Sequence, residues 1–208
     1  MLSNGDISQV HLPKTERGER TFLKIIESAE KMFLDKGYHG TGIKDITDEA
    51  GVGLGTFYLY FKDKKGLYSY LISQYSHVIR YEIAKKIQAA GPGIDRKEEE
   101  RLGLLAFLEL VQERPHYYHI IWESLYIDRT LFIQYYATFG KLYNRQIRSA
   151  QSKGEMQNFD PEIMAFMLMG IANFIGLRYA MFDPLADLEQ IASEVIRILD
   201  EGMFSKTQ

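Results

Sequence analysis

The amino-acid sequence predicts an all-α protein of about nine helices, with a three-helix N-terminal head and a larger C-terminal helical body. Three observations predict this class. Apolar residues recur with a helical period in almost every segment, and no segment alternates apolar and polar residues as a strand would. The length of 208 residues is enough for one good hydrophobic core or two small ones.

The head contains three predicted helices joined by glycines. Apolar residues at i, i+3, i+4, i+7 and i+11 predict a helix over residues 19–36, which Gly37 ends. Two short helices follow over residues 43–50 and 54–61, separated by Gly51-Val52-Gly53. The first of these glycines can take the left-handed conformation that ends a helix. Two short helices around a glycine turn indicate a helix-turn-helix, whose second helix enters the major groove of DNA.

The body is predicted to contain six helices, several with clear start or stop signals. Asp95 and Asp160 are suited to cap helix N-termini, and Pro115 opens another helix. The first body helix begins beside the head, so it could transmit motion between head and body. The predicted helices cover residues 63–88, 95–114, 115–127, 129–153, 161–182 and 188–199. We therefore expect a flexible tail over residues 1–18, a helix-turn-helix domain over 19–65 and a body over 66–208.

Composition excludes several classes of function. The absence of cysteine removes disulfides, thiol nucleophiles and thiolate metal sites. His116, His119 and Glu123 share one helical face, but two histidines and one carboxylate on a single helix rarely form a complete metal site, so no metal or other cofactor is expected. The first 20 residues are polar and show no apolar signal or anchor, which predicts a soluble cytoplasmic protein.

Charge bears on any contact with nucleic acid. The net charge is -3, and the first 70 residues contain ten basic and ten acidic residues. Contact with DNA must therefore come from locally placed cations and backbone amides rather than from a global positive field.

Residues 20–68 resemble the DNA-binding head of the TetR family of transcriptional regulators. The residues that carry the resemblance are Ala29, Phe33, Gly37-Tyr38, Thr41, Ile43, Asp45-Ile46, Ala50-Gly51-Val52, Gly55-Thr56-Phe57-Tyr58, Tyr60-Phe61, Lys64 and Leu67. The resemblance implies a homodimeric repressor that binds a palindromic operator in double-stranded DNA. It also implies that the divergent body binds a small effector and forms the dimer interface.

By position in the motif, the resemblance implies a set of DNA-binding residues: Lys44, Leu54, Gly55, Thr56, Tyr58, Tyr60 and Lys64. Leu54 and Gly55 would face base edges, and the hydroxyls and ammonium groups would bind phosphates or bases. Either tyrosine could instead lie partly in the core with only its hydroxyl outside. Three residues depart from the family pattern: Gly42 replaces a capping Ser or Thr, Thr47 replaces Ala, and Leu59 replaces His or Arg.

Aromatic residues concentrate in the body, where residues 103–182 hold 15 of the 27. A tyrosine-rich interior suits a pocket for an apolar or aromatic ligand, although such residues can also be ordinary core. We expect the pocket between the helices that carry Trp122, Phe139 and Met167. Its polar members could instead make internal hydrogen bonds or salt bridges. The candidate lining is Tyr118, His119, Trp122, Tyr126, Phe139, Tyr143, Met167, Asn173 and Arg178.

The segment 163–177 is apolar on all sides except for Gly170, Asn173 and Gly176. It is short for a bilayer span and contains an asparagine, so no membrane contact is expected. A helix that is apolar all round must be covered all round, which favours a second subunit on its outer face. The predicted dimer interface comprises Gly170, Phe174, Leu177, Ile191, Val195 and Ile198.

These observations favour a ligand-responsive DNA-binding regulator over two alternatives. One alternative is a helical enzyme with His119 and Glu123 as a general base, but the sequence offers no nucleophile or phosphate loop, so no enzyme is expected. The other is a protein-binding helical module. The sequence does not name the effector or the operator, and it leaves open whether the protein represses or activates.

Overall fold

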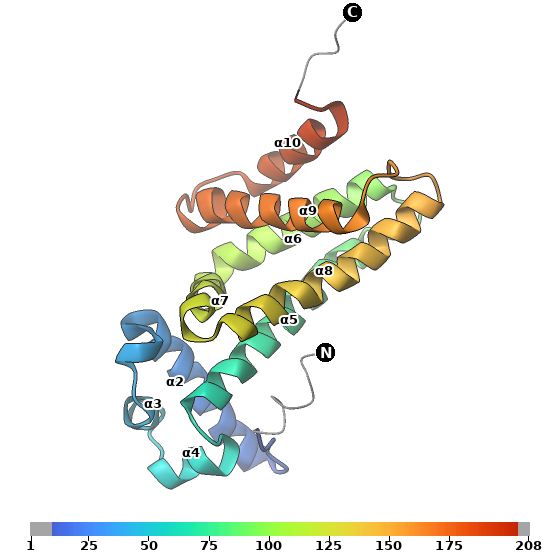
Figure 1. Ribbon diagram of the computed structural model, residues 1–208. Helices are drawn as coiled ribbons and strands as arrows, with labels where there is room; N and C mark the ends of the chain where they lie inside the picture. Colours follow the sequence, from blue (N-terminus) through green and yellow to red (C-terminus); the bar gives the residue numbers. More distant parts are fainter. Residues whose placement is uncertain (1–9, 204–208) are drawn as a thin grey trace, which may run out of the picture. The chain divides into compact units, whose positions relative to one another are not determined.

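The computed structural model describes residues 10–203, which fold into nine α-helices and one π-helical segment, without a β-strand in that range (Figure 1). This confirms the predicted all-α class and its helix-turn-helix head. The elements are α2 (Glu16–Gly40), α3 (Ile43–Ala50), α4 (Leu54–Tyr60), α5 (Lys64–Ala89), α6 (Arg96–Glu113), α7 (Pro115–Ile127), α8 (Arg129–Ser152), α9 (Pro161–Ile175), η1 (Gly176–Met181) and α10 (Leu188–Glu201).

The first helix begins earlier than the periodicity indicated. The hydroxyl of Thr15 accepts a hydrogen bond from the N–H of Gly18 at 3.1 Å, so the helix starts at Glu16 instead of residue 19. Just before it, Val10 forms an isolated antiparallel bridge with Phe61. Residues 10–18 thus include an isolated bridge and the start of the first helix, residues 1–9 lie outside the described residues, and the flexible tail stays a prediction.

The chain divides into two compact units whose limits differ from the predicted domain boundary at residue 65. One unit comprises the chain up to Ser76 together with His116–Thr138. The other comprises His77–Pro115 together with the chain from Phe139 onward. The helix-turn-helix thus shares its unit with α7 and the first part of α8, which the sequence placed in the body.

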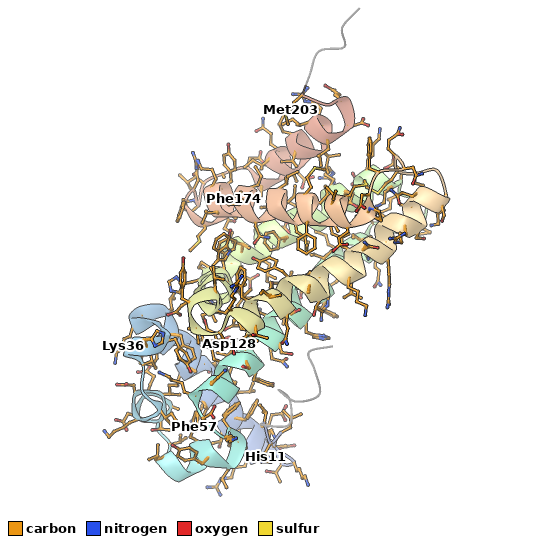
Figure 2. All side chains as sticks on the ribbon, in the orientation of Figure 1. His11, Lys36, Phe57, Asp128, Phe174 and Met203 are labelled. Atoms are coloured by element: carbon orange, nitrogen blue, oxygen red, sulfur yellow. The ribbon has the colours of Figure 1, made fainter. Side chains whose placement is uncertain are left out.

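Aromatic rings form the core of the first unit beneath α4. Phe57 lies on the inner face of α4 and is fully buried (Figure 2). Its ring centroid is 5.5 Å from that of Phe61, which in turn stacks on Phe22 of α2 at 5.2 Å. Two ion pairs join α2 to α3: Lys31 with Glu49 at 2.5 Å, and Lys36 with Asp45 at 3.3 Å.

In the second unit, α6 packs against α9, η1 and α10. Leucines of α6 such as Leu105 and Leu108 are buried there. The approach is close at Gly176, where a Cβ atom would lie 3.2 Å from the ring of Phe107. A side chain at residue 176 would therefore require the Phe107 ring to shift by a few tenths of an ångström. The predicted helix over 161–182 has nearly its expected extent, but its last six residues wind as a π-helix.

One stretch within residues 10–203, Pro161–Met181, is long and apolar enough to cross a membrane. Length and composition are weak evidence for a span, because core helices of soluble proteins pass the same test. Of its 21 residues, only Ala165, Gly176 and Ala180 are buried. Its exposed apolar face therefore requires a surface to pack against. The expectation that this surface is not a membrane stays a prediction.

Substituting Phe57 with Ala should destabilise the head by about 3 to 5 kcal/mol, because it leaves a cavity beneath α4. Leu59→Ala, on the exposed face of the same helix, is the matched control and should change the free energy of unfolding by no more than about 0.5 kcal/mol. Urea unfolding followed by circular dichroism measures both. Equal losses in the two variants would contradict the packing described.

Candidate nucleic-acid interface

The turn between α3 and α4 has the geometry of a helix-turn-helix. Gly51 adopts a left-handed conformation with φ 65° and ψ 36°, and its N–H donates to the carbonyl of Asp48. The N–H of Val52 donates to the carbonyl of Thr47 at 3.0 Å. The buried hydroxyl of Thr47 donates to the carbonyl of Lys44, so the extra polar atom at this packed joint is satisfied.

The start of α3 is capped without a side chain at the usual position. Gly42 is extended, and its N–H donates to a carboxylate oxygen of Asp45 at 2.7 Å. This hydrogen bond and the ammonium of Lys36 lower the pKa of Asp45. Asp45 thus satisfies the N–H of the N-cap residue, whereas no side chain at residue 42 caps the N–H groups of the first turn of α3.

The outer face of α4 presents three of the predicted DNA-binding residues to solvent. Leu54 and Gly55 are exposed at its N-terminal turn, and Tyr58 is 51% exposed. No atom lies within 4 Å of the position that a Cβ of Gly55 would take. Thr56 is half-buried. The helix therefore offers an open, small-residue surface at one end while Phe57 holds its other face in the core.

Tyr60 is partly buried, which agrees with the alternative that one of the tyrosines lies partly in the core. Its hydroxyl donates to the carbonyl of Gly18 at 3.2 Å, and its ring meets Phe22 edge-on at 5.4 Å. The side chain thus fastens the end of α4 to the first turn of α2. A DNA contact by this hydroxyl stays a prediction.

The ammonium group of Lys64 is held inside the head. It donates to the carbonyls of Tyr38 and Thr41, each at 2.6 Å, and lies 4.2 Å from the centroid of the Tyr38 ring. Burial lowers the pKa of Lys64, while Glu123 and Asp45 act in the opposite direction. Since an ammonium has three N–H groups, a phosphate could receive only the third. The predicted phosphate contact at this residue therefore competes with a structural role.

Lys44, by contrast, is available to an external anion. Its side chain is exposed and pairs only along its own helix with Asp48 at 2.9 Å. Exposed pairs of this kind contribute little to stability. A phosphate could replace the carboxylate at little cost.

One contact of the head could not be seen in the sequence. The N–H of Tyr38 donates to the Oε1 atom of Glu123, on α7, at 2.8 Å. The two residues are 85 positions apart, and no local pattern connects them. The helical spacing of the sequence pairs Glu123 only with His116 and His119.

The structure separates those three residues. Glu123 faces Tyr38, the imidazole of His116 lies 3.9 Å from a carboxylate oxygen of Glu30, and His119 is exposed. Within residues 10–203, no group of three or more histidines and carboxylates could hold a metal ion. A general base formed by Glu123 and His119 has no geometric support here.

Four of the predicted effector residues belong to the first unit. The ring of Tyr118 stacks on Trp122 with centroids 5.7 Å apart. Burial raises the pKa of Tyr118 to about 12, and the neighbouring Trp122 opposes that shift. His119 is exposed, and Tyr126 is 84% exposed. Of the aromatic pair on α7, Tyr118 is buried and Trp122 is half-buried, while the other two side chains are exposed.

The remaining predicted effector residues belong to the second unit, and most have internal partners. The hydroxyl of Tyr143 donates to the carboxylate of Glu100, which pairs with Arg96. The amide of Asn173 donates to the carbonyl of Met169, and Arg178 pairs with Asp183 at 3.6 Å.

The other two have different surroundings. The guanidinium of Arg80 lies 5.3 Å from the centroid of the Phe139 ring, and Met167 is exposed. Because the nine residues are divided between the two units, ligand binding by them stays a prediction.

The predicted dimer residues differ in exposure. Phe174 is 63% exposed and Ile198 is also exposed, while Leu177 and Ile191 are half-buried. No atom lies within 4 Å of a Cβ position at Gly170. Val195 is already buried within the chain, so it has little surface left for a partner. The exposed members all lie on α9 and the end of α10.

The short helix α4 follows a glycine turn, is packed through its inner face and exposes its outer face. This arrangement defines a helix-turn-helix protein. The family model described as "Bacterial regulatory proteins, tetR family" matches residues 25–71, which include this motif. The chain belongs to the TetR family of bacterial regulatory proteins.

Comparison with individual proteins agrees with this assignment. The HTH-type transcriptional activator FasR of Mycolicibacterium smegmatis is 28% identical over 116 residues, which are 56% of this chain and 50% of that protein. The chain thus spans about half the length of that relative. The fatty acid metabolism regulator protein of Bacillus subtilis is 24% identical over 200 residues, covering 89% of this chain and 96% of that protein.

A solved structure has the same fold. The transcriptional regulator FadR from Bacillus subtilis, in complex with stearoyl-CoA, has a TM-score of 0.69 at 20% identity. The match covers 88% of this chain and 100% of that chain.

Lys64→Ala should destabilise the head by about 2 kcal/mol, because it leaves two backbone carbonyls without their charged donor. Lys44→Ala removes the same charge from an exposed side chain and should change stability by less than about 0.5 kcal/mol. Urea unfolding of the two variants tests this difference. If both unfold at the wild-type midpoint, the internal role of Lys64 is wrong.

Proposed function

We propose that the protein is a transcriptional regulator that binds a palindromic operator as a homodimer and leaves it when an effector with an apolar chain binds. The observation that carries the proposal is the outer face of α4. Leu54, Gly55 and Tyr58 point away from a helix whose inner face is fixed by Phe57. A helix of this kind fits the major groove, which is about 12 Å wide in B-form DNA.

The individual residues suit separate tasks at the groove. Gly55 lets the backbone come close to base edges, and Leu54 beside it offers an apolar contact, such as to a thymine methyl group. The hydroxyl of Tyr58 and the ammonium of Lys44 are exposed and can bind phosphates. These contacts are local, which is consistent with a net charge of -3.

The proposed dimer forms through an apolar stripe on α9. Ile163, Met167, Gly170 and Phe174 recur at i, i+4, i+7 and i+11, so they share one helical face. Ile163 is 69% exposed and Phe174 63%. Gly170, in the middle of the stripe, would let the partner helix approach closely. A two-fold dimer matches the two half-sites of a palindrome.

The proposed effector is a long-chain acyl thioester. The support is the Bacillus subtilis FadR structure with stearoyl-CoA and the similarity to a fatty acid metabolism regulator that covers 89% of this chain. The stacked pair of Tyr118 and Trp122 supplies aromatic surface suited to an acyl chain. We further propose that the protein is a repressor and acts in the cytoplasm, where bacterial operators lie.

The function is tested by selecting bound sequences from a random duplex pool with the full chain. A palindrome should be enriched, and stearoyl-CoA should lower affinity for it by about 5- to 150-fold, which is the usual range of coupling between two sites. Stearoyl-CoA should also change the fluorescence of Trp122, the only tryptophan. Free coenzyme A is the control and should have neither effect. Failure to enrich any sequence would exclude the regulator, and unchanged affinity and fluorescence would exclude this effector.

Phe174→Glu places a charge in the proposed dimer interface and should convert the dimer to monomer. Leu185→Glu adds the same charge at a residue that is 94% exposed and lies outside α9, and it should leave the dimer intact. Sedimentation velocity at micromolar concentration measures the state of both variants. A wild-type protein that is monomeric under these conditions would refute the interface, as would binding to lipid vesicles through α9.

A further inference from the structure

We propose that Glu123 is a positioning residue that connects α7 to the helix-turn-helix and relays effector binding to it. The inference rests on the proposed function, because it needs both an operator and an effector. It concerns a backbone corner, residues 37–41, which joins α2 to the start of α3. All of the contacts that carry it lie within the first unit.

The first observation is how closely the carboxylate fits the corner. Gly37 interrupts the helical backbone of α2 with φ 69°, and the next N–H, that of Tyr38, donates to Glu123 Oε1 at 2.8 Å. A Cβ atom at Gly37 would lie 3.0 Å from the same oxygen. Glycine is therefore needed at residue 37 for its positive φ and for the space that the carboxylate occupies.

The second observation is a cation at the same corner. Lys64 donates to the carbonyls of Tyr38 and Thr41. A carboxylate thus accepts from the N–H of Tyr38 while an ammonium group donates to its carbonyl. Gly42, which follows Thr41, is the N-cap of α3, so the position of this corner sets where the helix-turn-helix begins.

The third observation is that the carboxylate is incompletely bonded. Its Oε2 atom is buried and has no hydrogen-bond partner among the described residues. Leaving a buried carboxylate oxygen unsatisfied costs free energy, so this arrangement is less stable than one in which water or a donor satisfies Oε2. A small shift of α7 that lets water reach Oε2 would favour release of the Tyr38 N–H.

The fourth observation is that α7 also carries the aromatic pair proposed to meet the effector. Trp122 directly precedes Glu123, and Tyr118 stacks on it from the previous turn. A rigid helix cannot move Trp122 without moving Glu123.

Two further contacts join α7 to α5 and α2: the buried hydroxyl of Tyr68 donates to the carbonyl of Ile120 at 2.6 Å, and the imidazole of His116 lies 3.9 Å from Glu30. Directly after α7, Asp128 (Figure 2) also pairs with Lys65 at 2.7 Å. Since Lys65 is exposed, that ion pair is the weaker constraint.

The test compares Glu123→Ala and Glu123→Gln with the wild-type full chain. Operator affinity is measured by fluorescence anisotropy with and without stearoyl-CoA, and stearoyl-CoA binding is measured separately without DNA. Glu123→Ala should weaken operator binding in the absence of stearoyl-CoA, because the corner loses the carboxylate that positions it. It should also reduce the effect of stearoyl-CoA on operator affinity to less than about twofold, from the usual range of about 5- to 150-fold, while still binding stearoyl-CoA. Glu123→Gln keeps an oxygen that can accept from Tyr38, so it should retain most of the response.

Glu113→Ala is the matched control, because it removes an exposed carboxylate at the end of α6. It should respond to stearoyl-CoA as the wild type does. A Glu123→Ala variant with wild-type operator affinity and a full response would overturn the proposal, as would a Glu113→Ala variant that loses the response equally.

Hydrogen exchange of the Tyr38 amide in the wild type provides a measurement that does not depend on a variant folding. Stearoyl-CoA should accelerate this exchange by about tenfold or more if its binding breaks the hydrogen bond from the Tyr38 N–H to Glu123. Unchanged protection in a protein that does release its operator would overturn the proposal. If stearoyl-CoA does not bind the protein and does not release it from the operator, the proposed effector is wrong. In that case the role of Glu123 is tested by operator affinity alone, and a Glu123→Ala variant with wild-type operator affinity would overturn it.

Discussion

The recognition surface depends on the burial of aromatic rings beneath α4. An isolated helix of seven residues is unstable in water, so α4 exists only because its inner face is packed. Phe57 and Phe61 provide that packing against Phe22 of α2. The bridge of Val10 to Phe61 and the hydrogen bond of the Tyr60 hydroxyl close the end of the helix from outside. The exposed residues of α4 can therefore vary without loss of the helix itself.

Local signals explain why most of the helix boundaries could be predicted. Asp95 and Asp160 cap α6 and α9 through hydrogen bonds to N–H groups only two or three residues further along the chain. Gly51 ends α3 because it adopts a left-handed conformation. The site could be predicted only where exposure follows from helical spacing, as for Tyr58. The internal bonds of Lys64 and Glu123 could not, because each joins backbone and side chain 23 to 85 residues apart. The same limit hid the grouping of α7 with the head.

The apolar segment 163–177 shows a second limit of sequence reasoning. The composition indicated that every face of the helix needs a cover, but it could not say which face the chain covers itself. The structure divides them: Ala165 and Gly176 are buried, while Ile163 and Phe174 are exposed. On α10, Val195 faces inward although it shares an apolar pattern with the exposed Ile198. An apolar pattern identifies a buried surface only together with the neighbours that bury it.

The head thus combines an aromatic core with a corner that a polar contact links to α7. The aromatic core under α4 is buried and close-packed, so it resists deformation as a unit. The corner at residues 37–41 packs the Tyr38 ring against Phe33 and Tyr68, and it also makes a polar contact with a carboxylate that has an unsatisfied buried oxygen. In the proposed relay, a shift of α7 acts on the corner through this carboxylate, and α3 and α4 move together because their shared core is close-packed. Such an arrangement would let a regulator change the direction of its recognition helix while it keeps the surface of that helix intact.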